Sequence, residues 1–478
     1  MSRPGQLFQI AAPRAARDTP QQQIVRTSLK TYDTAVARGR GRFSDWQAAR
    51  TRAAAIKADA VAHLDRYLAQ FEAGIQARGG QVHWAADAAE ARAIILEIAR
   101  RRQAKCVIKS KSMVSEEVHL TPALEAAGIE TVETDLGEYI VQLRNEPPYH
   151  IVTPAMHLKR TQIAALFQEK LGTPPEADSA EELAGAARRT LREKFLSADI
   201  GITGANFLVA DAGVVAITEN EGNARLTASL PRVHVVLTGL EKILPRLEDL
   251  ALFWPMLATA GTGQPITCYS SLIGGPRRAG EADGPEEFHV VLLDNGRTGV
   301  LADAERRDTL HCIRCGACLN ICPVFHTIGG HAYGTTYSGP IGAVLTPLLQ
   351  GQAAFGHLSY ASSLCGACTE VCPVKIDLHH HLIENRRDSN QQHLRPAPEN
   401  WGLAVFRWVV SSQRRYERAG WWARRLLRLR NWVPAGTPLD PLHPWTATRD
   451  LPAAPKESFR EWWRRERSAP RSRGVAAR

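Results

Sequence analysis

The sequence predicts an α/β domain followed by a smaller, cysteine-rich domain. Two observations support this order. Between residues 79 and 299, apolar strand-like runs alternate with helical patterns, which is typical of a mostly parallel sheet covered by helices. Seven of the nine cysteines then fall between residues 312 and 372, in two short runs. At 478 residues, the chain is long enough for two or three domains, each with its own core.

The elements of the α/β part follow from the periodicity of apolar residues. Apolar side chains recur at helical spacing between residues 42 and 78, and Gly79-Gly80 ends this helix. Period-2 or continuous apolar runs predict the strands that follow, with helices between the first three of them. We expect strands at 81–85, 105–109, 128–134, 213–218, 233–239 and 288–294, and helices at 88–102 and 121–127.

The cysteine runs carry the most specific signal in the chain. Residues 312–323 read CIRCGACLNICP, the complete C-x2-C-x2-C-x3-C-P pattern of bacterial iron–sulfur ferredoxins. Residues 365–373 read CGACTEVCP, which lacks the first cysteine, and Ser362 stands in its place. In such runs three thiolates bind one cluster, while the cysteine before the proline binds the neighbouring cluster. The pattern therefore predicts two iron–sulfur clusters and one-electron chemistry.

Crossed ligation divides the seven cysteines into two sets. The first set is complete and predicts a [4Fe-4S] cluster. The second set has three cysteines with Ser362 or solvent at the fourth corner, so this site could hold a [4Fe-4S] cluster, a [3Fe-4S] cluster or a labile cluster. Cluster 1 is assigned to Cys312, Cys315, Cys318 and Cys372, and cluster 2 to Cys322, Cys365 and Cys368.

Zinc and disulfide bonds are the competing explanations for these cysteines. Structural zinc usually takes two separated C-x2-C pairs, and a triplet followed by C-P is crowded for a tetrahedral ion. The first sixteen residues contain arginines but no continuous apolar run, so we expect no secretory signal and no disulfides. Reduced thiols predict a cytoplasmic protein. Cys106 lies in an apolar run and is interpreted as a buried core residue, and Cys268 receives no role.

The C-terminal region is basic and rich in tryptophan. The net charge of the whole chain is +10, whereas from Leu394 onward eighteen Lys/Arg face seven Asp/Glu, and eight of the eleven tryptophans follow residue 400. Tryptophans that pack on the chain's own body beneath solvated arginines are the simplest explanation. A protein partner and an anionic membrane surface, at its inner face, are the alternatives. Nucleic acid is not expected, because no recognised binding motif accompanies the charge.

Three polar, flexible segments suggest a binding crevice in the α/β domain: 109–117, 201–206 and 218–225. Ligands of α/β sheets favour the loops beyond the carboxyl ends of the strands. Lysines and hydroxyls there suit a carboxylate or phosphate, and Glu219 or Glu221 suits a base or nucleophile. For each loop taken alone, turn chemistry and solvated charge are the preferred explanation, whereas the three loops together favour a binding crevice. Neither a G-x-G-x-x-G nor a Walker A pattern is present.

Several stretches together resemble one family. They are 109–117 (KSKSMVSEE), 201–207 (GITGANF), 218–223 (TENEGN), 293–297 (LDNGR), 337–342 (YSGPIG) and both cysteine runs. From about residue 20 to about 465, in family order, the chain looks like the iron–sulfur protein B family of bacterial lactate utilization. The resemblance implies an α/β lactate-utilization domain of the NagB/RpiA/CoA-transferase-like fold, followed by a helical ferredoxin domain with two iron–sulfur clusters. It also implies that a seven-cysteine pattern is normal for the family.

The implied function is electron transfer during the oxidation of L-lactate to pyruvate, together with companion subunits of the A and C types. Oxidising a 2-hydroxy acid removes two electrons, and a cluster carries one at a time, so we expect a partner to supply the two-electron centre. The chain is then an electron-transfer component rather than a complete enzyme, and no catalytic residue is assigned. The alternatives are an α/β-domain enzyme of acyl, CoA or sugar-phosphate chemistry with clusters as redox sensor, and a cluster-stabilised scaffold. The expected division is 1–78 (helical segment), 79–299 (α/β domain), 300–390 (ferredoxin domain) and 391–478 (basic, Trp-rich region).

Overall fold

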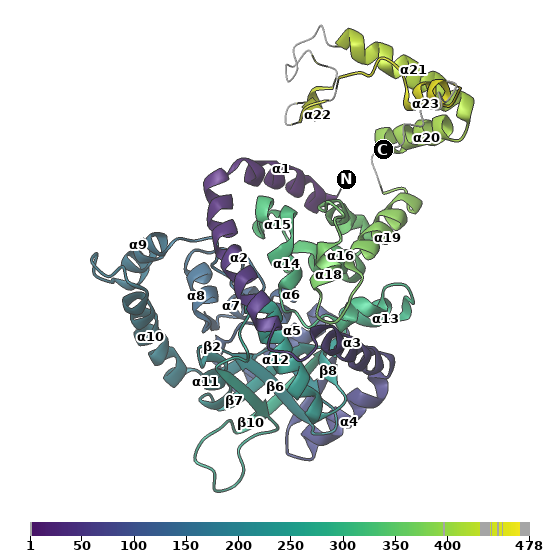
Figure 1. Ribbon diagram of the computed structural model, residues 1–478. Helices are drawn as coiled ribbons and strands as arrows, with labels where there is room; N and C mark the ends of the chain where they lie inside the picture. Colours follow the sequence, from purple (N-terminus) through teal and green to yellow (C-terminus); the bar gives the residue numbers. More distant parts are fainter. Residues whose placement is uncertain are drawn as a thin grey trace, which may run out of the picture. The chain divides into compact units, whose positions relative to one another are not determined.

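The computed structural model describes residues 2–394, 397–430, 440, 442–446, 449–451 and 453–468. These residues belong to two compact units, Met1–Leu394 and Arg395–Arg478. The first unit contains the sheets, the helices that cover them and both cysteine runs (Figure 1). None of the described helices combines the length and the apolar character that are needed to cross a lipid bilayer.

A six-stranded, fully parallel sheet forms the centre of the first unit, in the order β1-β10-β7-β4-β2-β3. Strands β2, β4 and β7 are buried along their whole length, as expected for parallel strands covered on both faces. The predicted mostly parallel sheet is confirmed. Its strands are β1 (Gln81–Ala85), β2 (Cys106–Lys109), β3 (Glu130–Glu133), β4 (Ile200–Thr203), β7 (Val233–Gly239) and β10 (Glu287–Leu293).

A second, four-stranded sheet has the order β8-β5-β6-β9. The strand expected at 213–218 exists as β6, but it pairs antiparallel with β5 and β9 in this second sheet, not with the parallel strands. The tight connection at Gly213, with φ of +56°, reverses the chain between β5 and β6 and makes them antiparallel neighbours. The strands are β5 (Phe207–Val209), β6 (Val214–Glu219), β8 (Ile243–Leu244) and β9 (Tyr269–Ile273).

Helices cover both faces of the parallel sheet. On one face Phe71 and Ile75 of α4 share a core with Val236. On the other face Ile95 of α5 packs in a core with Val107. The helices of this part are α3 (Trp46–Ala62), α4 (Leu64–Gln76), α5 (Ala88–Arg101), α6 (Met113–Glu117), α7 (Leu120–Ala126), α8 (Leu136–Leu143), α9 (Arg160–Leu171), α10 (Ala180–Ser197), α11 (Asn223–Ser229), α12 (Leu250–Thr262) and α13 (Arg297–Ala302).

The single helix expected at 42–78 is interrupted at His63, which separates α3 from α4. His63 has φ of −127° and ψ of 41°, outside the helical region. Its Nδ1 atom lies 3.0 Å from the Asp59 carbonyl oxygen, which the backbone N–H of His63 also contacts. A side chain that competes for a helix carbonyl in this way favours a break.

Two N-terminal helices, α1 (Arg3–Arg17) and α2 (Thr19–Arg40), contact the cysteine-rich segment, and α2 also packs against α12 of the α/β part (Figure 1). Helix α1 contacts α15 and α17, and α2 contacts α12 and α14. The cysteine-rich segment itself is helical: α14 (Ala317–Ile321), α15 (Pro323–Ile328), α16 (Gly339–Gln350), α17 (Gln352–Phe355), α18 (Ala367–Val371) and α19 (Leu378–Gln391). Because one apolar core joins residues of α2, β5, α12 and the cysteine runs, this segment and the α/β part fold as one body.

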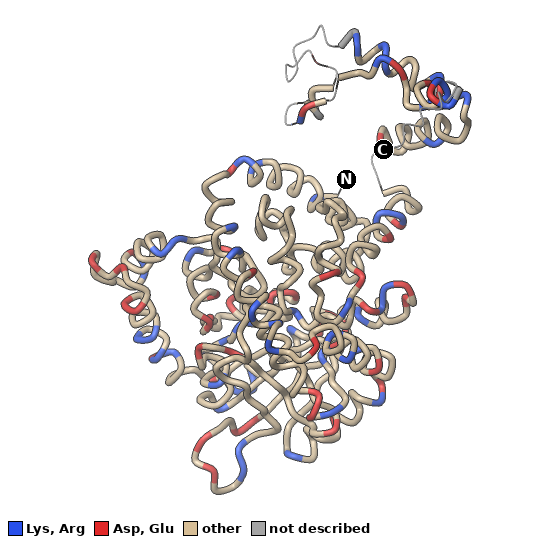
Figure 2. Tube along the Cα trace, in the orientation of Figure 1, with Lys and Arg blue, Asp and Glu red and all other residues tan. Residues whose placement is uncertain are grey.

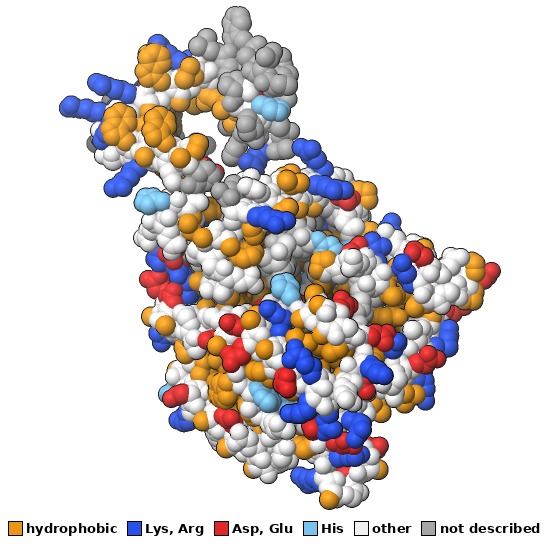
Figure 3. Space-filling model, turned by 180° about the vertical axis from the view of Figure 1, so that it is seen from behind, with side chains coloured by type: hydrophobic (Ala, Val, Ile, Leu, Met, Phe, Trp, Pro, Cys, Tyr) orange, Lys and Arg blue, Asp and Glu red, His pale blue; other side chains and the backbone are white. Residues whose placement is uncertain are grey.

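The second unit contains α20 (Ala397–Val410), α21 (Gln413–Arg430), α22 (His443–Thr446) and α23 (Phe459–Ser468). Lys and Arg outnumber Asp and Glu along α21 and α23 (Figure 2). Large apolar side chains of this unit are exposed, among them Trp401 and Phe406 of α20 and Trp422 of α21. Figure 3 shows hydrophobic side chains beside Lys and Arg on one face of this unit. Trp432, the side chain of Trp445 and most of the Pro-rich stretch 433–444 lie outside the described residues.

Candidate metal centres and an adjoining cavity

The two cysteine runs have the same backbone conformation at positions fifty residues apart. Arg314 and Leu364, each directly before a cysteine, have φ of +60° and +54°. The glycines after those cysteines, Gly316 and Gly366, both have φ of +79°, and the short helices α14 and α18 follow and contact each other. The second run is therefore a structural repeat of the first, with Ser362 at the position of Cys312.

Four of the seven cysteines line one small cavity: Cys312, Cys315, Cys318 and Cys372. About 370 Å³ of space in and around it is free of protein atoms, part of it open to solvent. Most of the other walls are apolar, including Ile313, Ile341, Val374 and Ile376. These four are the cysteines that crossed ligation assigns to cluster 1. Their ligation itself stays a prediction.

The other three cysteines form a separate electrostatic group. Burial raises the pKa of the Cys368 and Cys322 thiols, and the nearby Cys365 raises both further, as Cys322 does for Cys368. Burial also raises the pKa of Cys315 and Cys318, but there the additional effect comes from Cys312 and Cys372. Of the seven cysteines, only Cys365 is exposed. Ser362 belongs to the same stretch, and its Oγ atom accepts a hydrogen bond from the Leu364 N–H at 3.1 Å.

The chemistry of both sets suits iron–sulfur clusters. Burial raises the pKa of Cys372 to about 12 and that of Cys368 to about 11, so binding of a metal to the thiolates releases protons. Backbone donors face the sulfurs: the Ile376 N–H donates to Cys372 Sγ at 3.4 Å, and a hydrogen bond from Ala367 lowers the pKa of Cys365. Buried thiols in an apolar cavity with N–H···S contacts form an environment that fits clusters held by cysteine.

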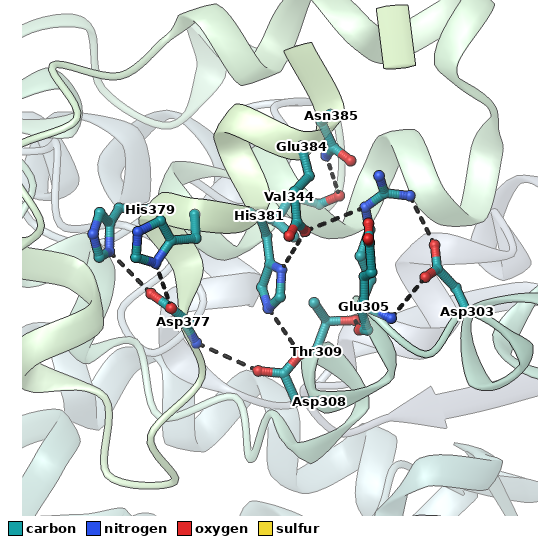
Figure 4. A network of polar contacts seen from close by, with 12 residues as sticks. Asp303, Glu305, Asp308, Thr309, Val344, Asp377, His379, His381, Glu384 and Asn385 are labelled. Atoms are coloured by element: carbon teal, nitrogen blue, oxygen red, sulfur yellow. Dashed lines mark hydrogen bonds and ion pairs between the residues drawn. The ribbon is translucent and has the colours of Figure 1, made fainter. Parts of the chain in front are cut away.

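Polar contacts from distant segments hold the second run in place. The buried Arg50 of α3 donates from Nε to the Cys372 carbonyl oxygen at 2.9 Å. On α19, His381 lies between two carboxylates, with Nε2 at 2.7 Å from Asp308 and Nδ1 at 2.9 Å from Glu384 (Figure 4). Burial opposes the charged imidazolium, but hydrogen bonds to these carboxylates raise the pKa of His381. The cationic form therefore joins α19 to the 3₁₀ turn Arg307–His311, which precedes Cys312.

A buried charge network connects the first cysteine run to the parallel sheet. The Arg297 guanidinium donates to both oxygens of Glu117 at 2.8 and 2.9 Å, and from Nε to Glu241 at 2.6 Å. Tyr337 donates its hydroxyl to Glu117 at 2.5 Å, and Arg314 donates to Glu241 at 3.3 Å. Burial alone would raise the pKa of Glu241, but Arg297 and Arg314 lower it to about 2. Glu241 is therefore ionised and compensated.

A larger cavity of about 670 Å³ adjoins the cysteines. All three polar segments line this one cavity, as expected for a crevice, while binding in it stays a prediction. The lining residues are Ser110–Val114 from the first segment, Gly204–Asn206 from the second, and Thr218–Glu221 with Asn223 and Ala224 from the third. It lies at the carboxyl ends of β2, β4 and β7, where ligands of α/β sheets bind. Ile151, Arg314 and Cys315 line both this cavity and the cysteine cavity, so the two share a wall.

The glutamates predicted as base or nucleophile have structural contacts. Glu219 accepts backbone hydrogen bonds from Ala224 and Arg225, both at 2.8 Å, at the start of α11. Glu221 accepts from the Leu136 N–H at 3.0 Å, at the start of α8. Burial raises the pKa of both carboxyls. Both line the cavity, but hydrogen bonds to helix starts already occupy them.

Two cationic lining residues were missed by the sequence analysis. Lys242 lies in the 3₁₀ turn Leu240–Lys242 directly after β7, and Arg314 lies between the first two cysteines. The sequence does contain a signal for Lys242, because this lysine follows a predicted strand at its carboxyl end, where ligands of α/β sheets bind. Conversely, Lys109 of the first segment is fully buried away from the cavity, 2.7 Å from Glu133 and 3.1 Å from Glu116.

Three family models match successive parts of the chain. A LUD domain matches residues 68–293, a 4Fe-4S dicluster domain matches 308–376, and the C-terminal region of lactate utilisation protein B matches 383–468. The dicluster match supports iron–sulfur clusters in the segment that contains the cysteine runs. The order agrees with the expected α/β domain followed by a ferredoxin-type domain.

Curated relatives match over nearly the whole length. Lactate utilization protein B of Shouchella clausii is 43% identical over 462 residues, which is 96% of each chain. The protein of the same name from Bacillus thuringiensis is 42% identical over 466 residues, 97% of this chain and 96% of its own. A solved structure of a DUF162 family protein from Deinococcus radiodurans matches 48% of this chain and 98% of its own, with 14% identity and a TM-score of 0.28. This chain belongs to the lactate utilization protein B family.

Proposed function

We propose that this chain transfers electrons, one at a time, during the oxidation of L-lactate to pyruvate. The observation that carries the proposal is the sorting of seven cysteines into two sets, one around a buried cavity and one nearer the surface. When bound, an iron–sulfur cluster accepts and releases single electrons. A buried set beside a set with an exposed member provides a route from the interior of the protein to its surface.

The proposed ligands are those of the crossed assignment. Cys312, Cys315, Cys318 and Cys372 hold a [4Fe-4S] cluster. Cys322, Cys365 and Cys368 hold a second cluster, [4Fe-4S] or [3Fe-4S], without a fourth protein ligand. Ser362 is not a ligand in this proposal, because its oxygen already accepts the Leu364 N–H.

Companion subunits of the A and C types are the proposed partners. Oxidation of a 2-hydroxy acid removes two electrons together, so another redox centre must accept the pair before single electrons pass through this chain. The basic second unit, with exposed Trp401 and Trp422, is the proposed docking region for a companion or for an anionic membrane surface. Truncation after Asn400 tests this: co-purification with the companions falls while iron content is unchanged. Undiminished co-purification contradicts a docking role.

Complementation of a gene deletion tests the electron-transfer function. The deletion strain carries the wild-type gene, Cys315→Ala or Cys268→Ala, and growth on L-lactate is measured together with the iron content of each purified protein. We expect Cys315→Ala to fail and to lose iron. Cys268→Ala is the matched control, because Cys268 is a free cysteine outside both sets, and it restores growth. Full growth with Cys315→Ala contradicts the proposal.

A second experiment separates an electron-transfer component from an enzyme that works through its α/β domain. Glu219→Gln removes a carboxylate from the cavity and keeps an oxygen acceptor for the start of α11. If electron transfer is the function, this variant supports growth on L-lactate, whereas Cys315→Ala does not. The opposite pattern, with failure of Glu219→Gln alone, supports the enzyme. Growth with both variants contradicts the electron-transfer function and gives no support to the enzyme.

A further inference from the structure

The cavity of about 670 Å³ contains an uncompensated cation. Lys242 is 6% exposed and lines the cavity, yet its ammonium makes no hydrogen bond or ion pair with any described residue. The neighbouring Lys57 shows the contrast, because its ammonium donates to the carbonyl oxygens of Glu241 and Ile243. Burial of an ammonium without a partner destabilises the folded protein by on the order of several kcal/mol, because the charge loses its hydration. Binding of an anion at this position is therefore favoured.

A second cation lies at the same end of the cavity. Arg314 lines the wall shared with the cysteine cavity, and its Nη1 atom has no hydrogen-bond partner, although Nη2 reaches Glu241. Arg314 reaches Glu241, the residue directly before Lys242, so the two cations lie near each other. Burial and the neighbouring Arg314 lower the pKa of Lys242 to about 8. An anion between them relieves this repulsion. A guanidinium also suits the two oxygens of a carboxylate.

The other charged residues of the lining are already compensated. Lys111 donates to Asp135 at 3.2 Å, while Glu219 and Glu221 accept backbone N–H groups. Over the whole lining, three cations (Lys111, Lys242, Arg314) face three acids (Asp135, Glu219, Glu221). This balance disfavours a phosphate with two or more negative charges and suits a single carboxylate. Hydroxyl and amide groups from Ser112, Thr153 and Asn206 supply partners for hydroxyl or carbonyl groups of the ligand.

We propose that this cavity binds a small organic monocarboxylate, a 2-hydroxy or 2-oxo acid, with its carboxylate held by Lys242 beside Arg314 and the proposed cluster of Cys315. The choice of acid rests on the proposed function, whereas the anion site rests on the geometry alone. No reaction of the acid in this cavity is implied, because the cavity would supply binding and orientation only.

The position next to Cys315 has a consequence for electron transfer. A bound carboxylate adds negative charge beside the cysteine cavity, and the reduced form of the proposed cluster is itself more negative. The acid therefore binds more tightly to the oxidised protein, and by linkage it lowers the midpoint potential. A tenfold preference for the oxidised form corresponds to a decrease of about 59 mV for one electron.

Calorimetric titration of the full-length, cluster-loaded protein tests the site. L-lactate, pyruvate and inorganic phosphate are used as separate probes on wild type, Lys242→Met and Lys242→Arg. We expect lactate or pyruvate to bind wild type and phosphate to bind at least tenfold more weakly. Loss of one charged hydrogen-bonding partner predicts a roughly 10- to 100-fold weaker affinity in Lys242→Met, with most of it restored in Lys242→Arg. Lys105→Met, which removes an exposed lysine outside the cavity, is the matched control and binds as wild type does.

Redox titration distinguishes an anion site from simple compensation of the cluster charge. If Lys242 only offsets thiolate charge, Lys242→Met shifts the midpoint potential, but neither acid binds wild type, which overturns the proposal. The proposal is also overturned if phosphate binds wild type as tightly as lactate or pyruvate does, or if Lys105→Met weakens binding as much as Lys242→Met does. If the proposal holds, pyruvate or lactate lowers the potential of wild type and not that of Lys242→Met. Growth conferred by the cysteine variants tests the electron-transfer function independently, so each idea can fail without the other.

Discussion

Arg297 and Glu117 form a buried, bidentate ion pair between α13 and α6, with N–O distances of 2.8 and 2.9 Å. Glu241, in the 3₁₀ turn directly after β7, accepts a hydrogen bond from Nε of the same guanidinium, and Tyr337 from the cysteine-rich segment donates to Glu117. The network therefore fixes the first cysteine run relative to the carboxyl edge of the parallel sheet. Through Arg314 it also fixes the wall shared by the two cavities.

Replacement of Arg297 by Met tests this network. The change leaves Glu117 and Glu241 buried without their main counter-charge, and breaking a buried pair in this way typically costs about 3–5 kcal/mol. We expect this decrease in the free energy of unfolding, measured by urea denaturation under anaerobic conditions. Tyr337→Phe removes one hydrogen bond and should cost about 1–3 kcal/mol. Arg232→Met, which removes an exposed partner of Glu286, is the control and leaves the unfolding midpoint unchanged. Equal stability of Arg297→Met and wild type argues against the network.

The repeated turns of the cysteine runs allow a matched pair of glycine substitutions. Gly316 and Gly366 share φ of +79°, so alanine is strained at both by roughly 1–2 kcal/mol. A Cβ atom on Gly316 would lie 3.0 Å from Val152 Cγ2 and 3.2 Å from His150 Cε1, whereas one on Gly366 would meet nothing within 4 Å. We therefore expect Gly316→Ala to lose roughly 1–3 kcal/mol more than Gly366→Ala in urea denaturation. A similar decrease in the free energy of unfolding in the two variants would show that close packing of Val152 and His150 against Gly316 does not contribute.

Substitutions of Ser362 test whether the second cluster has three protein ligands. Ser362 Oγ accepts the Leu364 N–H, so Ser362→Ala should leave the iron content per chain unchanged. Ser362→Cys completes the four-cysteine pattern and should favour a four-iron cluster, seen in the EPR spectra of the oxidised and reduced protein. Loss of about half of the iron in Ser362→Ala would make the serine a ligand after all.

The pH dependence of stability tests the contact between His150 and α14. Val152 N–H donates to His150 Nδ1 at 3.1 Å, and the ring donates from Nε2 to Asn320 Oδ1 at 3.1 Å, so the neutral imidazole is required. Burial lowers the pKa of His150 to about 4. Above pH 6.5 both the folded and the unfolded protein hold this ring neutral. Between pH 6.5 and 4 only the unfolded chain takes up the proton. The free energy of unfolding therefore decreases as the pH is lowered through this range, by up to about 3 kcal/mol.

Urea denaturation at pH 7.5 and pH 5 measures this contribution. The difference in unfolding free energy between the two pH values should be smaller in His150→Asn than in wild type, because the ring that titrates is gone. His119→Asn, at an exposed position with left-handed backbone that asparagine tolerates, is the control and keeps the wild-type difference. An unchanged pH dependence in His150→Asn shows that the buried ring does not couple to folding.

Part of this protein was determined by the sequence alone. Cysteine spacing depends on local turns, so the two runs, the serine at position 362 and the dicluster character were readable without a fold. The alternation of apolar strands and helices likewise predicted the parallel sheet, because burial on both faces leaves continuous apolar runs. The crevice followed from the rule that loops after parallel strands meet at one edge.

The tertiary structure decided what depends on contacts between distant segments. The helical segment expected at 1–78 contains α1 and α2, but their packing depends on contacts with α12, α14, α15 and α17, which are distant in sequence. The placement of β6 in a second sheet depends on pairing with β5 and β9, which periodicity does not encode. Lys242 and Arg314 are 72 residues apart and meet only because the cysteine-rich segment packs on the carboxyl edge of the sheet. A charge without a partner is a property of the folded neighbourhood, and no single stretch of sequence contains it.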